Sequence, residues 1–528
     1  MKKLFTLICS LTLFYLPCHA QISWSSPPVT ISTPSVNASD PQVVTDTSGN
    51  VTAAWVENGV IQAIHMPFGG VFGPITSISN VSATSSNPRL GIDPAGNVSA
   101  IWVQNGVVNY STLPAGGTWS AEVAISNTGA SNPSIWVDSH GNKAAIWVRG
   151  GFIEAAQNPM SIGTWQPFSQ LSSNGADDNP DIYIGEGGTI LAVWHELVSG
   201  ADQVFSAKGI VNGAWGSPVN IVAVTSGAHH NFPKVVVDSN GNATAAWYSY
   251  QVTGNTFFQV AVVTSSLTTS TSTWTSIIQL SEIGFFDPSK LFLRLGLDSN
   301  GNTIAIWVNS YFGNNNFTIE SAVQPNGNAW VGPSALINSN LYAYQADLNV
   351  TSYGEAVTAF MFSDGTNINI QADVTPIDGQ IQNFFQGEII SQGIGNANPR
   401  VFAQYSSTNN TVYAASVWIN NNGTNNGIQA VTGVQPVVSP PTNLNVTEGS
   451  NNFGPFTEFF NTITWTQSVS SNITLYFIYR NGVLAASVPP SVTQYVDPNV
   501  VQNQAVTYGV AAVAVANFLS PIATVNFP

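Results

Sequence analysis

The chain has 528 residues, of which only 7% are charged, against about 25% in an average soluble protein. Its 27 acidic and 11 basic residues give a net charge of −16, which excludes nucleic acid as a partner because the chain would repel a phosphate backbone. The 44% of hydrophobic residues, with 15 tryptophans, suffice for a large core and exclude a disordered chain.

Residues 1–20 have the parts of a secretory signal peptide: Lys2 and Lys3 form the positive end, 4–16 the apolar stretch, and a small-residue cleavage site follows. A membrane anchor is an alternative, but this apolar run is too short to cross a bilayer. Lipid attachment through Cys18 is another alternative. We expect an exported protein that is secreted, periplasmic or on the cell surface. Its mature chain has no cysteine and no transmembrane segment.

Residues 22–433 contain one unit repeated eight times. Five copies carry the sequence D-x-x-G-N, and an aromatic residue recurs nine residues after the Asp position, or slightly later in the last copy. We interpret D-x-x-G-N as a hairpin turn and not as a calcium loop, because each copy offers one carboxylate. We interpret the aromatics as packing residues between blades. They are Trp55, Trp102, Trp147, Trp194, Trp247, Trp307, Phe360 and Trp418.

Each unit reads as four strands, with no helical periodicity. The first carries an aromatic such as Trp24, the second ends at the Asp, the third ends at the repeated aromatic, and the fourth contains a motif such as residues 61–63. Strand-only units of this length predict an all-β fold, a β-propeller. The blade number is eight, or seven, depending on whether the Trp24 strand completes the last blade.

The units resemble the repeats of bacterial β-propeller proteins, and D-x-x-G-N is loosely similar to the Asp-box of sialidase-like propellers. The Asp-box places its tryptophan much closer to the Asp. The resemblance therefore implies a fold, and sialidase activity does not follow from it.

Residues 434–441 form a short, stiff, proline-rich linker. Residues 438–528 resemble a fibronectin type III domain, on the motifs Ile463-Thr464-Trp465, Tyr476 to Gly482 and Tyr508 to Val513. The resemblance implies a β-sandwich that acts as a spacer or binding module without catalysis.

A polar residue stands four positions before each Asp position and is followed by an apolar one. In a propeller this strand is the innermost of its blade, so the eight polar side chains are expected at the mouth of the central channel. They are Gln42, Arg89, Ser134, Asp181, Lys234, Arg294, Asp347 and Arg400.

Four of the nine basic residues that remain after the leader occupy this set, which predicts a pocket for a carboxylate, a sulfate or an acidic sugar. Asp181 and Asp347 would orient the ligand. The alternative is that these charges only pair with one another across a solvated channel.

Loops on the same face carry a second polar set: Asp177, Asp178, His195, Glu196, His229, His230, Tyr248 and Tyr250. The usual metal-ligand spacings are missing, so we expect no metal site and no cofactor. Glu196 and Asp181 could form the carboxylate pair of a glycosidase, although nothing in their spacing selects them. A further polar set in the fourth strands, such as Glu154 and Glu320, is interpreted as hydrogen bonding between blades.

These features predict an exported binding protein, adhesin-like or lectin-like, that recognises a glycan or an extracellular protein through the propeller loops and channel mouth. The phosphate-binding, nucleophile-elbow and dinucleotide motifs are missing, and we assign no catalytic residue. A sialidase-like glycoside hydrolase or lyase and a non-catalytic scaffold remain as alternatives. The sequence names neither the ligand nor the oligomeric state.

Overall fold

We describe the protein from a computed structural model. It describes residues 22–527 except 174, 176, 223–227, 254–255, 270–272, 284–291, 311–316, 336–341, 364, 378–386, 394, 471–472, 503, 515–519 and 521. The expected leader lies outside the described residues. The chain divides into two compact units at Val434/Gln435. Within the described residues, no helix is long and apolar enough to cross a membrane.

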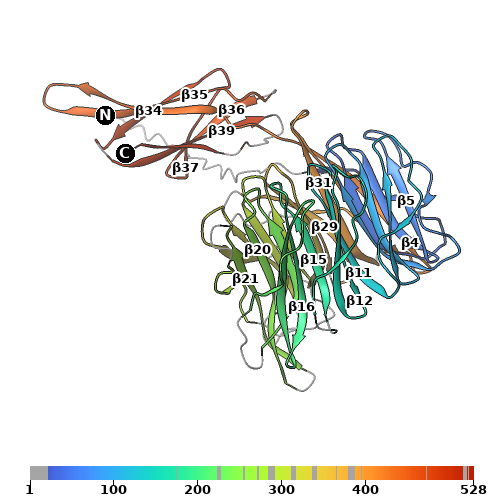
Figure 1. Ribbon diagram of the computed structural model, residues 1–528. Coiled ribbons are helices and arrows are strands. Elements are labelled where there is room, and N and C mark those ends of the chain that lie inside the picture. The colour runs from blue at the N-terminus through green and yellow to red at the C-terminus, as the bar shows by residue number, and fades with distance from the viewer. Residues whose placement is uncertain are drawn as a thin grey trace. The chain divides into compact units, whose positions relative to one another are not determined.

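The unit Ile22–Val434 contains eight antiparallel sheets among its described residues, and seven of them are built from strands that follow one another in the chain (Figure 1). The first strands of the sheets are β3 (Ala38–Thr45), β7 (Ser85–Ile92), β11 (Ala130–Val137), β15 (Asp178–Ile184), β19 (Ala228–Val237), β23 (Leu293–Leu297), β27 (Tyr342–Val350) and β31 (Asn396–Ser406). Each of these strands lies against the first strand of the next sheet, and β31 lies against β3. The sheets therefore form a closed ring, an arrangement consistent with propeller blades.

The second and third strands of each sheet form a hairpin that carries the core residues. The second strands are β4 (Val51–Glu57), β8 (Val98–Gln104), β12 (Lys143–Arg149), β16 (Thr189–Val198), β20 (Ala243–Thr253), β24 (Thr303–Ser310), β28 (Glu355–Ser363) and β32 (Thr411–Asn421). The third strands are β5 (Val60–Met66), β9 (Val107–Leu113), β13 (Phe152–Asn158), β17 (Ala201–Ile210), β21 (Thr256–Leu267), β25 (Phe317–Gln324), β29 (Ile368–Pro376) and β33 (Asn426–Pro436).

Short outer strands complete the sheets. They are β6 (Thr76–Ser77), β10 (Val123–Ala124), β14 (Ser169–Gln170), β18 (Val219–Asn220), β22 (Ile278–Gln279), β26 (Val331–Ala335) and β30 (Glu388–Ile389). In the last sheet this place is taken by β1 (Ser23–Trp24) and β2 (Val29–Thr30), which pair with β33. The Trp24 strand thus completes the last sheet. Every other sheet takes its outer strand from the sequence unit that follows it, so the described sheets still number eight.

The repeated aromatics are packing residues, as predicted. All seven tryptophans and Phe360 are fully buried. Trp55 in β4 packs against Val417 of the preceding sheet, and Trp147 in β12 packs against Ile101 of its preceding sheet. These side chains fill the space between neighbouring sheets, and fully burying one contributes on the order of 2–3 kcal/mol.

The D-x-x-G-N segments are hairpin turns, as predicted. One oxygen of Asp46 accepts the backbone N–H groups of Ser48 and Asn50, both at 2.9 Å, and the other accepts the side-chain amide of Asn50 at 2.7 Å. Gly49 has φ of 84°, a conformation that glycine adopts without strain. Asp93, Asp138, Asp238 and Asp298 hold the corresponding Asn in the same way.

Two glutamates of the fourth-strand polar set, which was expected to bond between blades, accept hydrogen bonds within their own sheet. Glu154 accepts the indole N–H of Trp147 at 2.9 Å, and Glu320 accepts that of Trp307 at 3.0 Å; each partner lies opposite on the neighbouring strand. Ser206 of the same set does bond between neighbouring sheets, because it accepts the indole N–H of Trp274 at 3.0 Å.

The unit from Gln435 onward is a pair of antiparallel sheets. One contains β34 (Thr442–Asn452), β35 (Thr457–Thr466) and β38 (Gln494–Val500), and the other contains β36 (Ile473–Arg480), β37 (Val483–Val488), β39 (Val506–Ala514) and β40 (Ala523–Phe527). Trp465, Tyr476 and Tyr508 are buried in one hydrophobic core between them.

Candidate functional site

The polar positions on the first strands are structurally equivalent in all eight sheets. Each pairs with the residue immediately before the repeated aromatic: Arg89 with Ile101, Lys234 with Ala246, and Arg400 with Val417, for example. We call these eight positions the central ring. It comprises Gln42, Arg89, Ser134, Asp181, Lys234, Arg294, Asp347 and Arg400. Seven of the eight stand at the fourth position of their strand or later, whereas Arg294 is the second residue of β23.

A register shift precedes the ring position in seven of the eight sheets, whereas the described part of β23 pairs with β24 without one. In five sheets the bulged residue is an Asx followed by proline, with φ near 50° in every case. Proline disfavours the right-handed helical region for the residue before it, and Asn and Asp tolerate the left-handed one. The five dipeptides begin at Asp40, Asn87, Asn132, Asn179 and Asn398.

Two cations of the central ring are neutralised by carboxylates of the same ring. The Lys234 ammonium lies 3.3 Å from Asp181, and the Arg294 guanidinium lies 2.8 Å from Asp347. The second oxygen of each aspartate accepts a backbone N–H of the next first strand, from Val235 in one case and from the residue after Arg400 in the other. This part of the ring follows the alternative in which the charges pair with one another.

Arg89 and Arg400 differ, because neither has an ion-pair partner among the described residues. Each donates one Nη1 hydrogen bond to the carbonyl of the proline before it, at 2.8 Å and 3.1 Å. Burial, followed by the charges of Arg400 and Arg294, lowers the pKa of Arg89 to about 10. The side chain is half-buried, so a positive charge is held there against both desolvation and repulsion.

The same electrostatics places the cations near one another. Arg89 belongs to β7 and Arg294 to β23, on sheets that are not neighbours, yet the charge of Arg294 contributes to the lowered pKa of Arg89. Lys234 also has a lowered pKa, caused first by burial, with Asp181 opposing it and Arg294 and Arg89 adding to it. The structure thus brings all six predicted charged residues to one place.

Asp40 is the nearby carboxylate that the sequence did not single out. Its charge raises the pKa of both Arg89 and Arg400, against the effect of burial, although it forms an ion pair with neither in the described structure. The charge of Asp347 acts on both arginines in the same direction. The central ring contains four cations and two carboxylates, and therefore carries a net positive charge inside an acidic protein. The recurring Asx-Pro dipeptide was the signal that could have identified Asp40.

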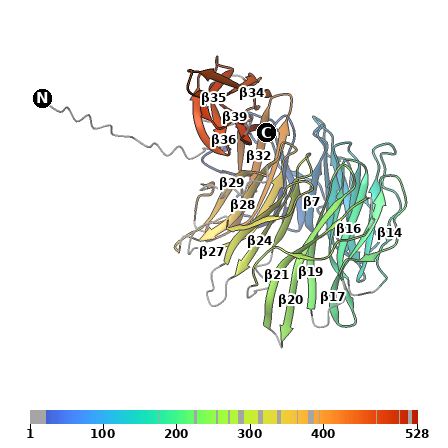
Figure 2. The ribbon, with the colours of Figure 1, turned by 90° about the vertical axis from the view of Figure 1, so that its left-hand side faces the viewer.

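A second polar group lies on two of the longer hairpins. Strands β16 and β17 have 10 residues each, β20 and β21 have 11 and 12, and β32 and β33 have 11 each, whereas β4, β5, β8, β9, β12 and β13 have seven. The hairpins β16–β17 and β20–β21 extend from the ring of sheets (Figure 2).

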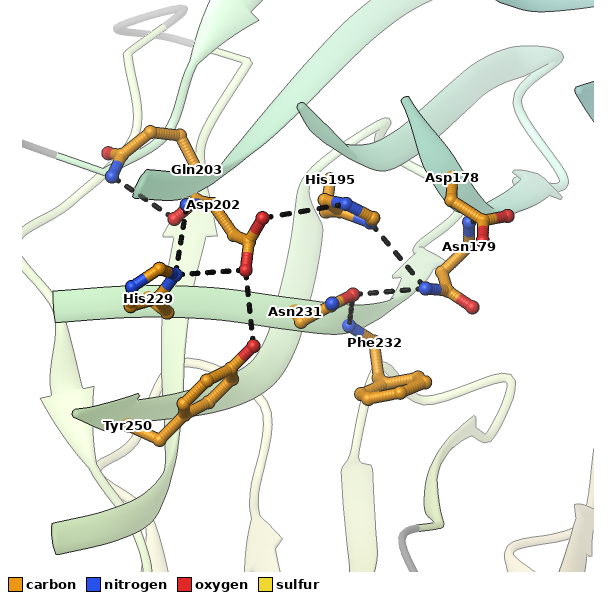
Figure 3. A network of polar contacts seen from close by, with 9 residues as sticks. All are labelled: Asp178, Asn179, His195, Asp202, Gln203, His229, Asn231, Phe232 and Tyr250. Carbon is orange, nitrogen blue, oxygen red and sulfur yellow. Dashed lines mark hydrogen bonds and ion pairs between the residues drawn. The ribbon is translucent and has the colours of Figure 1, made fainter. Parts of the chain in front are cut away.

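His195, Asp202, His229 and Tyr250 meet on these long hairpins and on β19, and we call them the seam cluster (Figure 3). Asp202 is its centre. One carboxylate oxygen accepts the Tyr250 hydroxyl at 3.2 Å and contacts His229 Nδ1 at 3.0 Å, and the other lies 3.7 Å from His195 Nε2. Burial lowers the pKa of His195, an effect that the charges of Asp202 and Asp178 oppose.

The Asn179 side-chain amide lies 3.5 Å from His195 Nδ1. His229 Nδ1 is closer to the Asp202 carboxylate, at 3.0 Å, than to the Asp202 backbone nitrogen, at 3.4 Å. Since a carboxylate only accepts hydrogen bonds, the proton of the neutral His229 imidazole lies on Nδ1, and its Nε2 is a hydrogen-bond acceptor.

Other residues of the predicted loop set are held in the core. Tyr248 donates to the carbonyl of Phe292 at 2.8 Å, and Glu196, which is buried, accepts the Trp194 indole N–H at 3.2 Å. Asp177 is 3% exposed, and burial raises its pKa to about 7. Tyr248, Glu196 and Asp177 are therefore buried in the propeller unit and not exposed on a loop surface.

Glu196 and Asp181 were the pair considered for glycosidase chemistry. Glu196 is bonded to an indole inside the core, and Asp181 is bonded to Lys234 in the central ring. No group of three histidine, cysteine or acidic residues in the described part of the chain is arranged to hold a metal ion.

No protein-family model matches the chain, and no curated protein matches it. Among solved structures, a fungal alcohol oxidase of the AA5 family in complex with copper is 11% identical, with a TM-score of 0.44 over 96% of this chain and 99% of that one. A PL25 polysaccharide lyase, an ulvan lyase bound to a GlcA–Rha3S ligand, is 11% identical with a TM-score of 0.43, over 76% and 95% of the two chains. An α-L-arabinanase of Penicillium chrysogenum, complexed with arabinobiose, is 11% identical with a TM-score of 0.33, over 48% and 92%. Function is therefore argued from the side chains of this chain.

Proposed function

We propose that this chain is an exported binding protein, in which an eight-bladed β-propeller over 22–433 is followed by a fibronectin type III domain over 438–528. The propeller holds the anionic group of a glycan at the central ring. The eight sheets in a closed series support the first assignment, and the two-sheet unit with buried Trp465 supports the second. The leader of residues 1–20 supports export.

The observation that carries the binding function is the pair of uncompensated guanidinium groups, Arg89 and Arg400. A buried cation without a partner costs free energy, and a protein stabilised only by its own contacts gains nothing from keeping two such groups side by side. An anionic ligand removes this cost. A carboxylate or sulfate matches the planar donor geometry of arginine, which forms charge-assisted hydrogen bonds to such groups.

Lys234 and Arg294 have a different part in this proposal. Asp181 neutralises Lys234 and Asp347 neutralises Arg294, so each pair has no net charge. Lys234 and Arg294 therefore donate hydrogen bonds that orient the ligand. Asp181 and Asp347 then accept hydroxyl groups of the ligand. A ligand with one acidic group and several hydroxyls, such as a uronic acid or a sulfated sugar, matches this distribution of charge.

The test is a screen of the protein without its leader on an array of acidic and neutral glycans. The R89A/R294A/R400A variant is screened beside it, at two salt concentrations because ionic binding is screened by salt. Lys208, exposed on β17, provides the control variant Lys208→Ala, which removes a cation outside the ring. Binding to acidic glycans that the triple variant loses and the control retains supports the proposal.

The same screen separates the other functions. Release of product from a bound glycan would identify a hydrolase or lyase. If neither protein binds an anionic glycan, the anion site is wrong, and the propeller is a scaffold for a protein partner.

A further inference from the structure

We propose that the seam cluster binds an uncharged, hydroxyl-bearing sugar ring next to the anionic group at the central ring, so that the ligand is an acidic oligosaccharide and not a single acidic sugar. This rests on the proposed function for the anionic end of the ligand. The neutral subsite itself is argued from the cluster alone.

The seam cluster lies on two of the longer hairpins of the ring. The strands of β16–β17 and β20–β21 have 10 to 12 residues, whereas seven-residue strands suffice to pack the first three sheets, and β32–β33 is lengthened too. Asp202 and Tyr250 lie on these longer hairpins. Lengthened hairpins in a ring of repeats are where loops with a binding role are expected.

Asp202 and His229 can accept further hydrogen bonds. A carboxylate can accept about four hydrogen bonds, and Asp202 receives Tyr250 and His229 on one oxygen, while the other has only a 3.7 Å contact to His195. His229 Nε2 is an acceptor, and the side chains of His229 and Asp202 are 23% and 19% exposed. Two acceptors from neighbouring residues thus remain available to a ligand.

The charges near the cluster favour a neutral ligand. Two adjacent acceptors suit two hydroxyl donors, and neighbouring hydroxyls of a sugar ring provide them. Asp202 brings one carboxylate to the cluster and Asp178, opposite His195 in the sheet, adds a second, while burial disfavours the charged form of His195. These carboxylates repel an anionic sugar, while the central ring attracts one.

The seam cluster and the central ring share two strands. Asn179 in β15 stands two residues before Asp181, and Asn231 in β19 stands three before Lys234. The Asn179 amide donates to Asn231 at 3.0 Å and approaches His195 (Figure 3). Strands β15 and β19 therefore carry both the Asp181–Lys234 pair and the polar side chains beside the seam cluster.

The test uses two variants that change the acceptors differently. His229→Ala removes the acceptor at His229 Nε2. Asp202→Asn turns His229 Nε2 into a donor, because the new side-chain amide donates to Nδ1 and the imidazole proton moves to Nε2. The exposed His140, on a turn of another sheet, provides the control His140→Ala. All variants are first shown to retain a native thermal transition.

The variants and the wild type are screened on an array that carries acidic monosaccharides, acidic oligosaccharides and neutral oligosaccharides. We expect both variants to lose at least tenfold in affinity for acidic oligosaccharides, with no change for acidic monosaccharides and none in the control. Equal binding by His229→Ala and the wild type would overturn the proposal, as would equal losses on monosaccharides and oligosaccharides.

The result also separates this proposal from the function on which it rests. Loss of neutral oligosaccharide binding in His229→Ala, with no acidic glycan bound by any protein, would refute the anion site and leave the neutral subsite standing. Absence of any glycan binding would refute both.

Discussion

His230 makes the stability of the propeller unit depend on pH. It is 3% exposed, and its Nδ1 accepts the indole N–H of the fully buried Trp247 at 3.1 Å. Burial, together with the neighbouring His229, lowers its pKa from 6.5 to about 4. Protonation would place a charge in the core and end the acceptor role of Nδ1.

The sign and size of the effect follow from proton binding. The unfolded chain binds the proton near pH 6.5 and the folded chain near pH 4, so the unfolded state binds more protons between these values and stability falls as pH falls. At about 1.4 kcal/mol for each pKa unit, His230 costs about 3 kcal/mol of folding free energy at pH 4 relative to pH 7.

The measurement is urea unfolding followed by tryptophan fluorescence between pH 4 and pH 7.5, for the wild type and His230→Gln. Glutamine retains an acceptor for the Trp247 indole and does not titrate. Other titrating groups are common to both proteins, so their effects cancel in the difference. We expect the variant to gain about 3 kcal/mol on the wild type as pH falls from 7 to 4. Parallel curves over the whole range would refute the reasoning.

Three further predictions follow from single residues. Burial raises the pKa of Asp177 to about 7, so its ionisation destabilises the folded state as pH rises. At pH 8, Asp177→Asn should raise the thermal midpoint and increase the free energy of unfolding by up to about 4 kcal/mol, with no such effect below pH 4. An added Cβ at Gly49 would lie 2.7 Å from ring atoms of Phe68 and Tyr413, whereas at Gly69 nothing lies within 4 Å. Both glycines have positive φ, so the backbone cost of alanine is common to both variants. Gly49→Ala should therefore lower the free energy of unfolding in urea by about 1–3 kcal/mol more than Gly69→Ala does. Arg89→Gln removes a half-buried charge that its neighbours repel, so calorimetry should show a thermal midpoint above that of the wild type; a lower midpoint would contradict the electrostatic description of the ring.

The architecture of the repeats was predictable because each unit places the same residue types at the same core positions. The repeated aromatics are buried between sheets, and the polar position four residues before the turn is in equivalent register throughout, as the fixed spacing from Asp to aromatic requires. Strand alternation then places the charges on one face. The partner of the Trp24 strand was open, because it is β33, about 400 residues later in the chain, and only closure of the ring decides it.

The seam cluster was only partly predictable. His195, His229 and Tyr250 drew attention as polar residues in long loops, but Asp202, which joins them, has no local feature that marks it. Its position depends on the pairing of β17 with β16, where Asp202 stands opposite Leu197. The sequence also did not predict that Lys234 and Arg294 form ion pairs while Arg89 and Arg400 do not. This difference depends on which side chains face each other across sheets.

Calorimetric titration of the wild type and the R89Q/R400Q variant with glucuronate, at low and at physiological salt, tests the anion site most directly. Heat of binding that weakens with salt and is absent in the double variant, with Lys208→Ala unchanged, is the expected result. No binding by the wild type, or equal binding by the wild type and the double variant, would contradict a ligand site at Arg89 and Arg400.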